Sequence, residues 1–234
     1  MGRTRRRFGP GSNPGFTLVE LLVVIGIIAA LISILMPALA RARNQAMRVN
    51  CQSQLRQLCN ATMMYANNYK GWLPGPSSIY DVMKFSGASA SVDSGLLWQA
   101  NLITDKRVWI CPVDHRRQAD LQYSYTYNCR MIVKRGFEDV FTPSNPGNPE
   151  VIPPPHFRRI TTFKSPSDCI LFAEENITNN NPQGWQINDA YFVYYDTTDN
   201  RHMGKSEVGY LDGHAGDIPP KIQIYTSKEW GWCH

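Results

Sequence analysis

The chain has 234 residues, with 24 lysines and arginines, 19 acidic residues and a formal net charge of +5. Residues 1–15 hold Arg3, Arg5, Arg6 and Arg7 and no acid, so this short segment accounts for all but one unit of the net charge. The nearly neutral remainder excludes the broad basic surface that is typical of nucleic-acid-binding proteins. The length accommodates one membrane helix and one globular domain of ordinary size.

An apolar run begins at Phe16 and continues to about residue 36, with Glu20 as its one charged residue. At about 1.5 Å per residue, twenty helical residues cross the ~30 Å hydrocarbon core of a bilayer. Basic residues ahead of such a run stay in the cytoplasm. The sequence therefore predicts a single-pass inner-membrane protein whose C-terminal part lies in the periplasm or outside the cell.

The presence of Glu20 in the apolar run needs a physical explanation, because placing a carboxylate near the membrane centre costs about 2.5–3.5 kcal/mol of free energy. If the chain is cut between Gly15 and Phe16, the new α-amino group of Phe16 is a cation one helical turn away. A neighbouring helix, shifted along its axis, could bring its own α-amino group to this carboxylate. Glu20 would then fix the register between assembled helices.

Residues 15–31, GFTLVELLVVIGIIAAL, resemble the class III signal of type IV prepilins and type II secretion pseudopilins. The resemblance implies that a prepilin peptidase and methyltransferase cleaves after Gly15 and N-methylates Phe16, which makes residues 1–15 a leader peptide. It also implies assembly with other pilin or pseudopilin subunits into a filament. An ordinary signal anchor has similar basic and apolar segments, whereas residues 34–37 lack the small residues of a secretory cleavage site.

The helical pattern is expected to continue to about residue 70, with residues 16–36 as its transmembrane or filament-core part. Pro37 should interrupt the helix and bend its axis. Gly71 and Pro74 give stop signals. Beyond Pro37, apolar positions recur at steps of three and four residues and form one stripe of an amphipathic helix; they are Met47, Cys51, Leu55, Leu58, Thr62, Tyr65 and Tyr69.

Residues 71–234 are predicted to form a globular domain in which an antiparallel β-sheet packs on the long helix, an α+β pilin-like fold. Strands are expected at residues 109–112, 123–128 (with one polar face), 159–164, 168–173, 190–195 and 207–211, and a short capped helix at residues 93–98. A hairpin turn is predicted at residues 212–214. Residues 141–157 and 175–186 have the composition of loops.

His202 is followed by nine residues and then by Asp212 and Gly213. This spacing resembles the H-X9-DG signature of a family of prepilin-like proteins abundant in planctomycete-type bacteria, which implies an assembly class and little more. We expect His202 and Asp212 to be hydrogen-bonded across a hairpin as a structural motif. Catalysis would also need a nucleophile or a metal, and the sequence has no hydrolase or metalloprotease motif, so no enzyme is predicted.

Six cysteines in an exported domain permit disulfides, but they allow 15 pairings. Cys51 and Cys59 would lie about 12 Å apart on a straight helix, which is beyond disulfide reach. Cys111 paired with Cys129, or Cys51 paired with Cys111, are the favoured disulfides, and free buried thiols remain the alternative.

No cofactor or metal is predicted, although clustered oxygens leave calcium open. The candidate calcium ligands are Asp196, Asp199 and Asp212. Zinc binding by His202, His214, Cys233 and His234 lacks a recognisable ligand spacing.

The sequence thus predicts a structural pilin or pseudopilin subunit of a type II secretion or type IV pilus-like filament. The alternative is a membrane-anchored extracytoplasmic module that binds a glycan, DNA or a secreted substrate, which the long loops and the aromatic residues of the C-terminal tail suggest.

Overall fold

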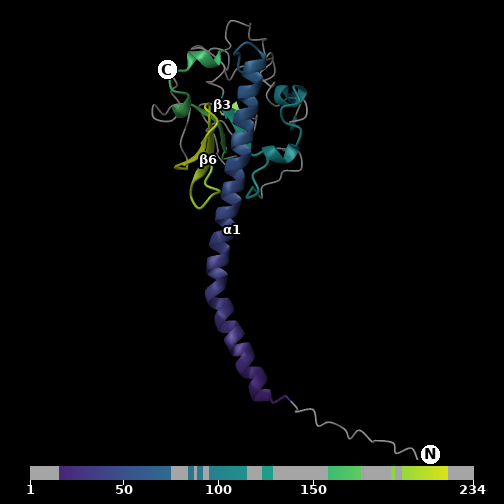
Figure 1. Cartoon of the computed structure of the whole chain (residues 1–234), viewed down its shortest axis with the longest axis vertical. Helices are drawn as coiled ribbons and strands as arrows, with labels where there is room; N and C mark the ends of the chain where they lie inside the picture. The colour runs from purple at the N-terminus through teal and green to yellow at the C-terminus, as the bar shows by residue number, and fades with distance from the viewer. Residues whose placement is uncertain are drawn as a thin grey trace, which may run out of the picture. The chain divides into compact units, whose positions relative to one another are not determined.

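The computed structural model describes residues 16–74, 84–86, 89–91, 95–114, 123–128, 158–174, 176, 191–192 and 197–220. The chain divides into two compact units, Met1–Arg43 and Asn44–His234. Helix α1 (Leu18–Asn68) begins in the first unit and ends in the second, as Figure 1 shows. The two units are described separately.

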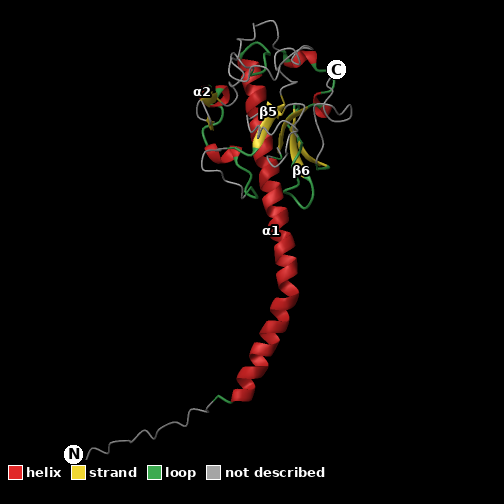
Figure 2. Ribbon diagram, turned by 180° about the vertical axis from the view of Figure 1, so that it is seen from behind, coloured by secondary structure: helices red, strands yellow, loops and turns green. Residues whose placement is uncertain are grey.

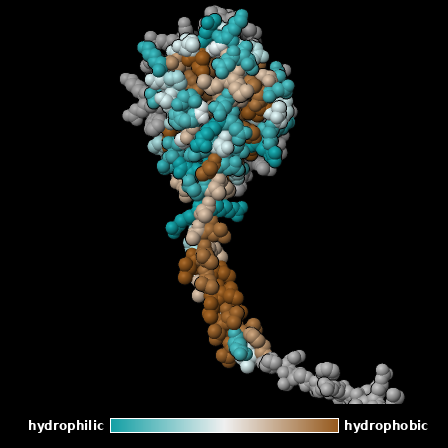
Figure 3. Space-filling view, viewed as in Figure 1, coloured by the Kyte–Doolittle hydropathy of each residue, from teal (hydrophilic) through white to brown (hydrophobic). Residues whose placement is uncertain are grey.

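In the first unit, α1 is long and apolar enough to cross a membrane, and none of its apolar stretch is buried by the protein. Figure 3 shows this part of the helix as a continuous hydrophobic surface. The helix continues through Pro37, so the expected interruption was wrong. A proline removes only one backbone donor, and the regular helix on both sides evidently tolerates that loss.

The second unit contains a five-stranded sheet in the order β5-β3-β4-β6-β7. Its strands are β3 (Tyr125–Asn128), β4 (Ile170–Glu174), β5 (Tyr191–Phe192), β6 (Ser206–Tyr210) and β7 (Ala215–Ile218). Within the sheet, β3 pairs antiparallel with β4, β4 with β6, and β6 with β7. Strand β5 pairs parallel to β3 at one edge. The predicted α+β architecture is confirmed. Strand β5 lies within the strand predicted at residues 190–195, but its parallel pairing differs from the expected antiparallel sheet.

Several short elements surround the sheet. They are the hairpin of β1 (Lys84–Ser86) and β2 (Ser89–Ser91), helix α2 (Leu96–Gln99), and the 3₁₀ helices η2 (Lys106–Trp109), η5 (Ile160–Thr162) and η6 (Pro166–Asp168). Helix α2 overlaps the short helix predicted at residues 93–98, but it extends to Gln99 and its N-cap residue, Gly95, provides no side-chain cap. Residues 141–157 and the C-terminal aromatic tail lie outside the described residues.

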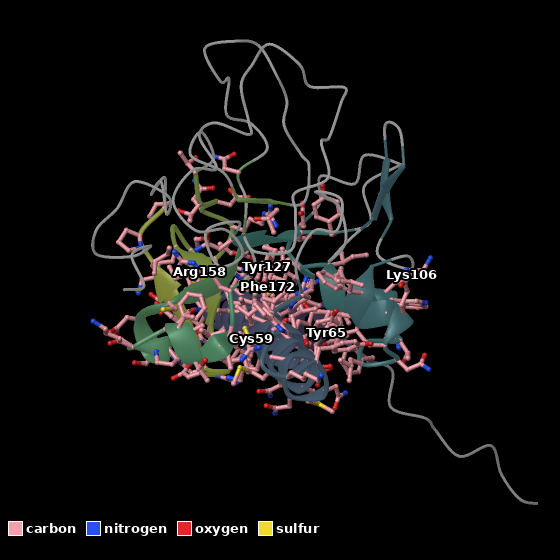
Figure 4. All side chains as sticks on the ribbon, turned by 90° about the horizontal axis from the view of Figure 1, so that it is seen from above. Cys59, Tyr65, Lys106, Tyr127, Arg158 and Phe172 are labelled. Carbon is pink, nitrogen blue, oxygen red and sulfur yellow. The ribbon has the colours of Figure 1, made fainter. Side chains whose placement is uncertain are left out.

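The second half of α1 packs one face on this sheet, and Figure 1 and Figure 2 both show it close to β6. The buried face carries Cys51, Leu55, Leu58, Thr62 and Tyr65, all of them predicted from the spacing. Figure 4 shows the side chains that fill the space between the helix and the sheet, including Tyr127 and Phe172, whose rings meet edge to face at 5.2 Å. Of the predicted stripe, Tyr69 is exposed, because it stands at the end of the helix.

Strand β3 differs from its predicted alternation, because all four of its residues are buried. The two polar side chains find backbone partners on β4: Thr126 Oγ1 donates to the Ala173 carbonyl at 3.2 Å and Asn128 Nδ2 to the Ile170 carbonyl at 2.8 Å. These hydrogen bonds remove the cost of burying both groups.

The strands predicted at residues 109–112 and 159–164 are not formed. Of residues 109–112 only Trp109 lies in a regular element, the 3₁₀ helix η2, and residues 110–112 are irregular. Residues 106–109 form η2, where the Asp105 side chain accepts a hydrogen bond from the Arg107 amide and caps the turn. Residues 160–162 form η5, and only Arg159 pairs as a strand would, through an isolated bridge to Trp72.

Gly209 of β6 allows α1 to approach the sheet closely. A Cβ atom added there would lie 2.5 Å from Cys59 Sγ and 3.5 Å from Leu55 Cβ. A side chain at this position would therefore push the helix and the strand apart.

We expect Gly209→Ala to destabilise the protein by about 1–3 kcal/mol, as overpacking of a close-packed core does. The matched control is Gly216→Ala on β7, where the new Cβ would make an ordinary 3.6 Å contact with Tyr210. Chemical denaturation of the full chain in detergent measures both. Equal stability of the two variants would contradict the close helix–sheet contact.

Candidate functional site

At the start of α1, Thr17 and Glu20 form a reciprocal capping box. The Glu20 carboxylate accepts hydrogen bonds from the Thr17 amide at 2.9 Å and from the Thr17 hydroxyl at 2.7 Å, while Thr17 Oγ1 accepts from the Glu20 amide at 3.3 Å. This pattern satisfies amide groups that a helix start leaves without partners. Glu20 therefore has a local role in the uncut chain, next to the assembly role that its charge suggests.

The predicted processing position is partly visible. Phe16 is 71% exposed, and Gly15 lies outside the described residues. Phe16 thus stands two residues ahead of Leu18, the first residue of α1, and the protein itself does not cover it.

A second group of chemically active side chains lies inside the globular unit, and we call it the buried cluster. It consists of Cys51 from α1, Cys111 after η2, Glu174 at the end of β4 and His202 before β6. The Sγ atoms of the two cysteines are 2.9 Å apart, Cys111 Sγ lies 3.3 Å from His202 Nε2, and His202 Nε2 lies 3.0 Å from Glu174 Oε1. The four residues are at most 3% exposed.

The surroundings of the buried cluster are polar on one side. The second carboxylate oxygen of Glu174 accepts a hydrogen bond from the Glu207 amide at 3.0 Å. Burial alone would lower the pKa of His202, but its hydrogen bonds to Cys111 and Glu174 and the charge of Glu174 raise that pKa to about 10. The hydrogen bond to Cys51 and burial raise the pKa of the Cys111 thiol.

The expected hydrogen bond between His202 and Asp212 is not formed, and this prediction needs correction. His202 contacts Glu174 and Cys111, whereas Asp212 Oδ1 accepts from the His214 amide at 3.1 Å and lies 2.5 Å from His214 Nδ1. Strand β6 separates the two residues, so the short sequence spacing does not bring them together.

Gly213 serves the hairpin between β6 and β7. Its φ of +93° lies in the left-handed region that favours glycine, and an added Cβ would lie 2.7 Å from Asn60 Oδ1 of α1. The Gly213 amide also donates to the Tyr210 carbonyl at 3.0 Å. The hairpin turn predicted at residues 212–214 is confirmed, and it closes against the helix.

The cysteines are only partly as predicted. Cys51 and Cys111 lie together as free thiols, Cys59 is a third free thiol, and Cys169 is disulfide-bonded. Cys129 and Cys233 lie outside the described residues. Neither favoured disulfide is therefore formed: Cys51 and Cys111 are in contact without a bond, and Cys111, being free, is not bonded to Cys129.

The candidate calcium ligands do not form one group where they are described. Asp199 accepts from the Asn200 amide at 2.7 Å and pairs with Arg201, Asp212 contacts His214, and Asp196 lies outside the described part of the chain.

Sequence reasoning missed Glu174 and Glu207. Glu174 ends strand β4 and Glu207 lies within strand β6, and both are fully buried. The signal in the sequence was an acidic residue within a segment predicted to be a buried strand, because acidic residues are rarely buried without a partner. Glu207 Oε1 accepts from Arg48 Nε at 2.6 Å, and Glu207 Oε2 accepts from Gln52 Nε2 at 2.6 Å. Arg48 also pairs with Asp217 of β7. This network holds α1 in register with the β6–β7 hairpin.

We expect Arg48→Ala to cost about 3 kcal/mol near neutral pH, because it leaves Glu207 charged, buried and without its cation. Burial already raises the pKa of Glu207 against the opposing hydrogen bonds from Gln52 and Arg48. In the variant the pKa of Glu207 in the folded chain rises further, whereas in the unfolded chain it has the ordinary Glu value of about 4.3. At pH values between these two pKa values, the folded chain therefore keeps a proton that the unfolded chain releases.

The stability loss in Arg48→Ala should therefore grow as the pH rises from about 4.3 towards the folded-state pKa, and urea unfolding at mildly acidic and neutral pH measures it. Arg56→Ala, which removes an exposed arginine from the same helix, is the control. A loss that does not change with pH would contradict an unpaired Glu207 as its cause.

Comparison with known proteins supports the N-terminal assignment. A family model described as "Prokaryotic N-terminal methylation motif" matches residues 12–36. Neither the curated proteins nor the solved structures give a match. The matched segment and the apolar helix fit a prepilin-like subunit with a single membrane anchor, and this motif implies processing by a prepilin peptidase and assembly with other pilin subunits.

Proposed function

We propose that this chain is a structural subunit of a type II secretion or type IV pilus-like filament. The observation that carries the proposal is the methylation motif at residues 12–36, which coincides with the start of an apolar helix that the protein itself leaves uncovered. Such a helix needs lipid before assembly and sister helices after it. The amphipathic second half of the same helix anchors the globular domain.

In this proposal residues 1–15 are a leader that faces the cytoplasm, residues 16–70 are the helix, and residues 71–234 are the domain presented outside the inner membrane. The four leader arginines favour this orientation. Peptidase cleavage after Gly15 releases the leader and gives Phe16 a free α-amino group, which the same enzyme then methylates.

Glu20 sets the register of assembly. After cleavage, its carboxylate offers a partner for the α-amino group of Phe16 on a neighbouring subunit, and this ion pair removes the cost of an isolated charge in a dry helix bundle. The capping box with Thr17 orients the carboxylate at the first helical turn. A preoriented carboxylate loses less side-chain entropy when the neighbour arrives.

The capping box makes it possible to separate charge from helix stability. Glu20→Gln keeps an oxygen that can accept from Thr17 but removes the charge, whereas Thr17→Ala removes the cap and keeps the charge. We expect Glu20→Gln to insert and to be cleaved normally but to be incorporated into filaments at least about tenfold less, equivalent to about 1.4 kcal/mol. Thr17→Ala should be incorporated close to the wild-type level.

Quantitative immunoblotting of sheared filaments and membranes from the native host measures incorporation and cleavage together. Normal incorporation of Glu20→Gln would contradict the charge-pairing role. An equal defect in Thr17→Ala would assign the effect to helix capping instead.

A further inference from the structure

We propose that the buried cluster of Cys51, Cys111, Glu174 and His202 is a structural zinc site. This inference is independent of the proposed filament function, because it concerns only the globular unit. The candidate ligand atoms all lie within 4.8 Å of one another, and all four residues are buried.

The donor set matches zinc chemistry. Two thiolates, one imidazole nitrogen and one carboxylate oxygen form a mixed sulfur, nitrogen and oxygen set that suits a borderline-soft divalent ion better than calcium or magnesium, which prefer oxygen ligands alone. The four ligands come from α1, the segment after η2, the end of β4 and the turn before β6. One ion would thus join four segments that are distant in the sequence.

The geometry requires only small movements. Zn–S bonds of about 2.3 Å and Zn–N bonds of about 2.0–2.1 Å in a tetrahedron place two sulfurs about 3.8 Å apart, and sulfur and nitrogen about 3.6 Å apart. The observed separations are 2.9 Å between the sulfurs and 3.3 Å between Cys111 Sγ and His202 Nε2. These two pairs therefore have to separate by less than about 1 Å for an ion to enter, and no two candidate ligand atoms are more than 4.8 Å apart.

The groups around the cluster complete such a site. The Glu207 amide donates a hydrogen bond to Glu174 Oε2, while Glu174 Oε1 faces His202. Hydrogen bonds of this kind from groups around a metal site hold the ligating carboxylate in a fixed orientation. Two thiolates and one carboxylate around Zn²⁺ leave a net charge of −1. The guanidinium of Arg201 lies near enough to feel this charge, although it already pairs with Asp199 and, at 2.9 Å, with Asp114.

The site is closed, since four protein ligands complete a tetrahedron and leave no position for a substrate. We therefore assign it a structural role. Cys51 lies one helical turn from Arg48 on α1, so the ion and the Arg48–Glu207 pair would fix the same part of the helix to the sheet. The first residue of the H-X9-DG pattern, His202, would be a zinc ligand, which gives it a role separate from that of Asp212.

A disulfide between Cys51 and Cys111 is the competing state, because it consumes both thiolates and excludes the ion. The two states are distinguishable in the full chain purified in detergent from native membranes. We expect about one zinc per chain by elemental mass spectrometry, and Cys51 and Cys111 that react with an alkylating agent only after a chelator is added. A chain without zinc, or one whose mass shows the Cys51–Cys111 disulfide, would overturn the proposal.

Matched variants test the ligand assignment. Cys111→Ala and His202→Gln should each lower the zinc content at least about tenfold, whereas Cys59→Ala, which removes another fully buried free thiol from α1, should retain it. Retention of zinc in both ligand variants would contradict the assignment.

Because a ligand variant can fail to fold, the wild-type chain provides a second measurement. Exchange of its metal for Co²⁺ should give the visible bands of a tetrahedral site and a thiolate charge-transfer band in the near ultraviolet. A chelator should lower the thermal unfolding temperature of the wild type and of Cys59→Ala alike. A cobalt spectrum without thiolate bands would overturn the proposal even where every variant unfolds.

Discussion

The structure depends on the burial of one face of α1 against the sheet. Leu55 and Leu58 are fully buried on this face, and Gly209 leaves just enough space for the helix to touch β6. The same packing brings Cys51 to Cys111 and His202, and it brings Arg48 to Glu207. The polar contacts that join α1 to the rest of the globular unit are therefore a consequence of where this helix lies.

Three carboxylates in apolar settings each have a distinct partner. Glu20 is held by Thr17, Glu174 by His202, and Glu207 by Arg48 and Gln52. Buried or lipid-exposed acids are expensive, and their best-attested use is to select one register among several apolar packings. Here Glu207 fixes the helix on the sheet, Glu174 joins β4 to the turn before β6, and our proposal gives Glu20 a register-setting task between subunits.

The sequence predicted the features that depend on local pattern. The spacing of apolar residues located the buried face of α1, and the apolar run at residues 168–173 located the central strand β4. The polar residues of β3 led to the wrong prediction of a solvent-facing side. Thr126 and Asn128 donate hydrogen bonds to backbone carbonyls of β4 and are buried. Residues 109–112 resemble a short strand broken by proline and residues 159–164 alternate as a strand does, but local capping and turn geometry override a pattern of only four to six residues.

The buried cluster could not be predicted, because its members are separated by up to 151 positions and none has a local motif. His202 was selected for its spacing to Asp212, yet its partner is Glu174, which reads as the end of an ordinary strand. Only the pairing of β4 with β6 and the packing of α1 bring these residues together. Contacts between residues so far apart in the chain cannot be predicted from the local pattern of a single sequence.

The central claim, that this chain is processed and assembled as a pilin-like subunit, is tested most directly by the intact mass and N-terminal sequence of the protein from native membranes. The account predicts a chain that begins at Phe16 and carries one added methyl group on its α-amino nitrogen. A chain that still carries the arginine-rich segment of residues 1–15 would contradict it, because Glu20 would then have no cationic terminus to meet in a neighbouring subunit.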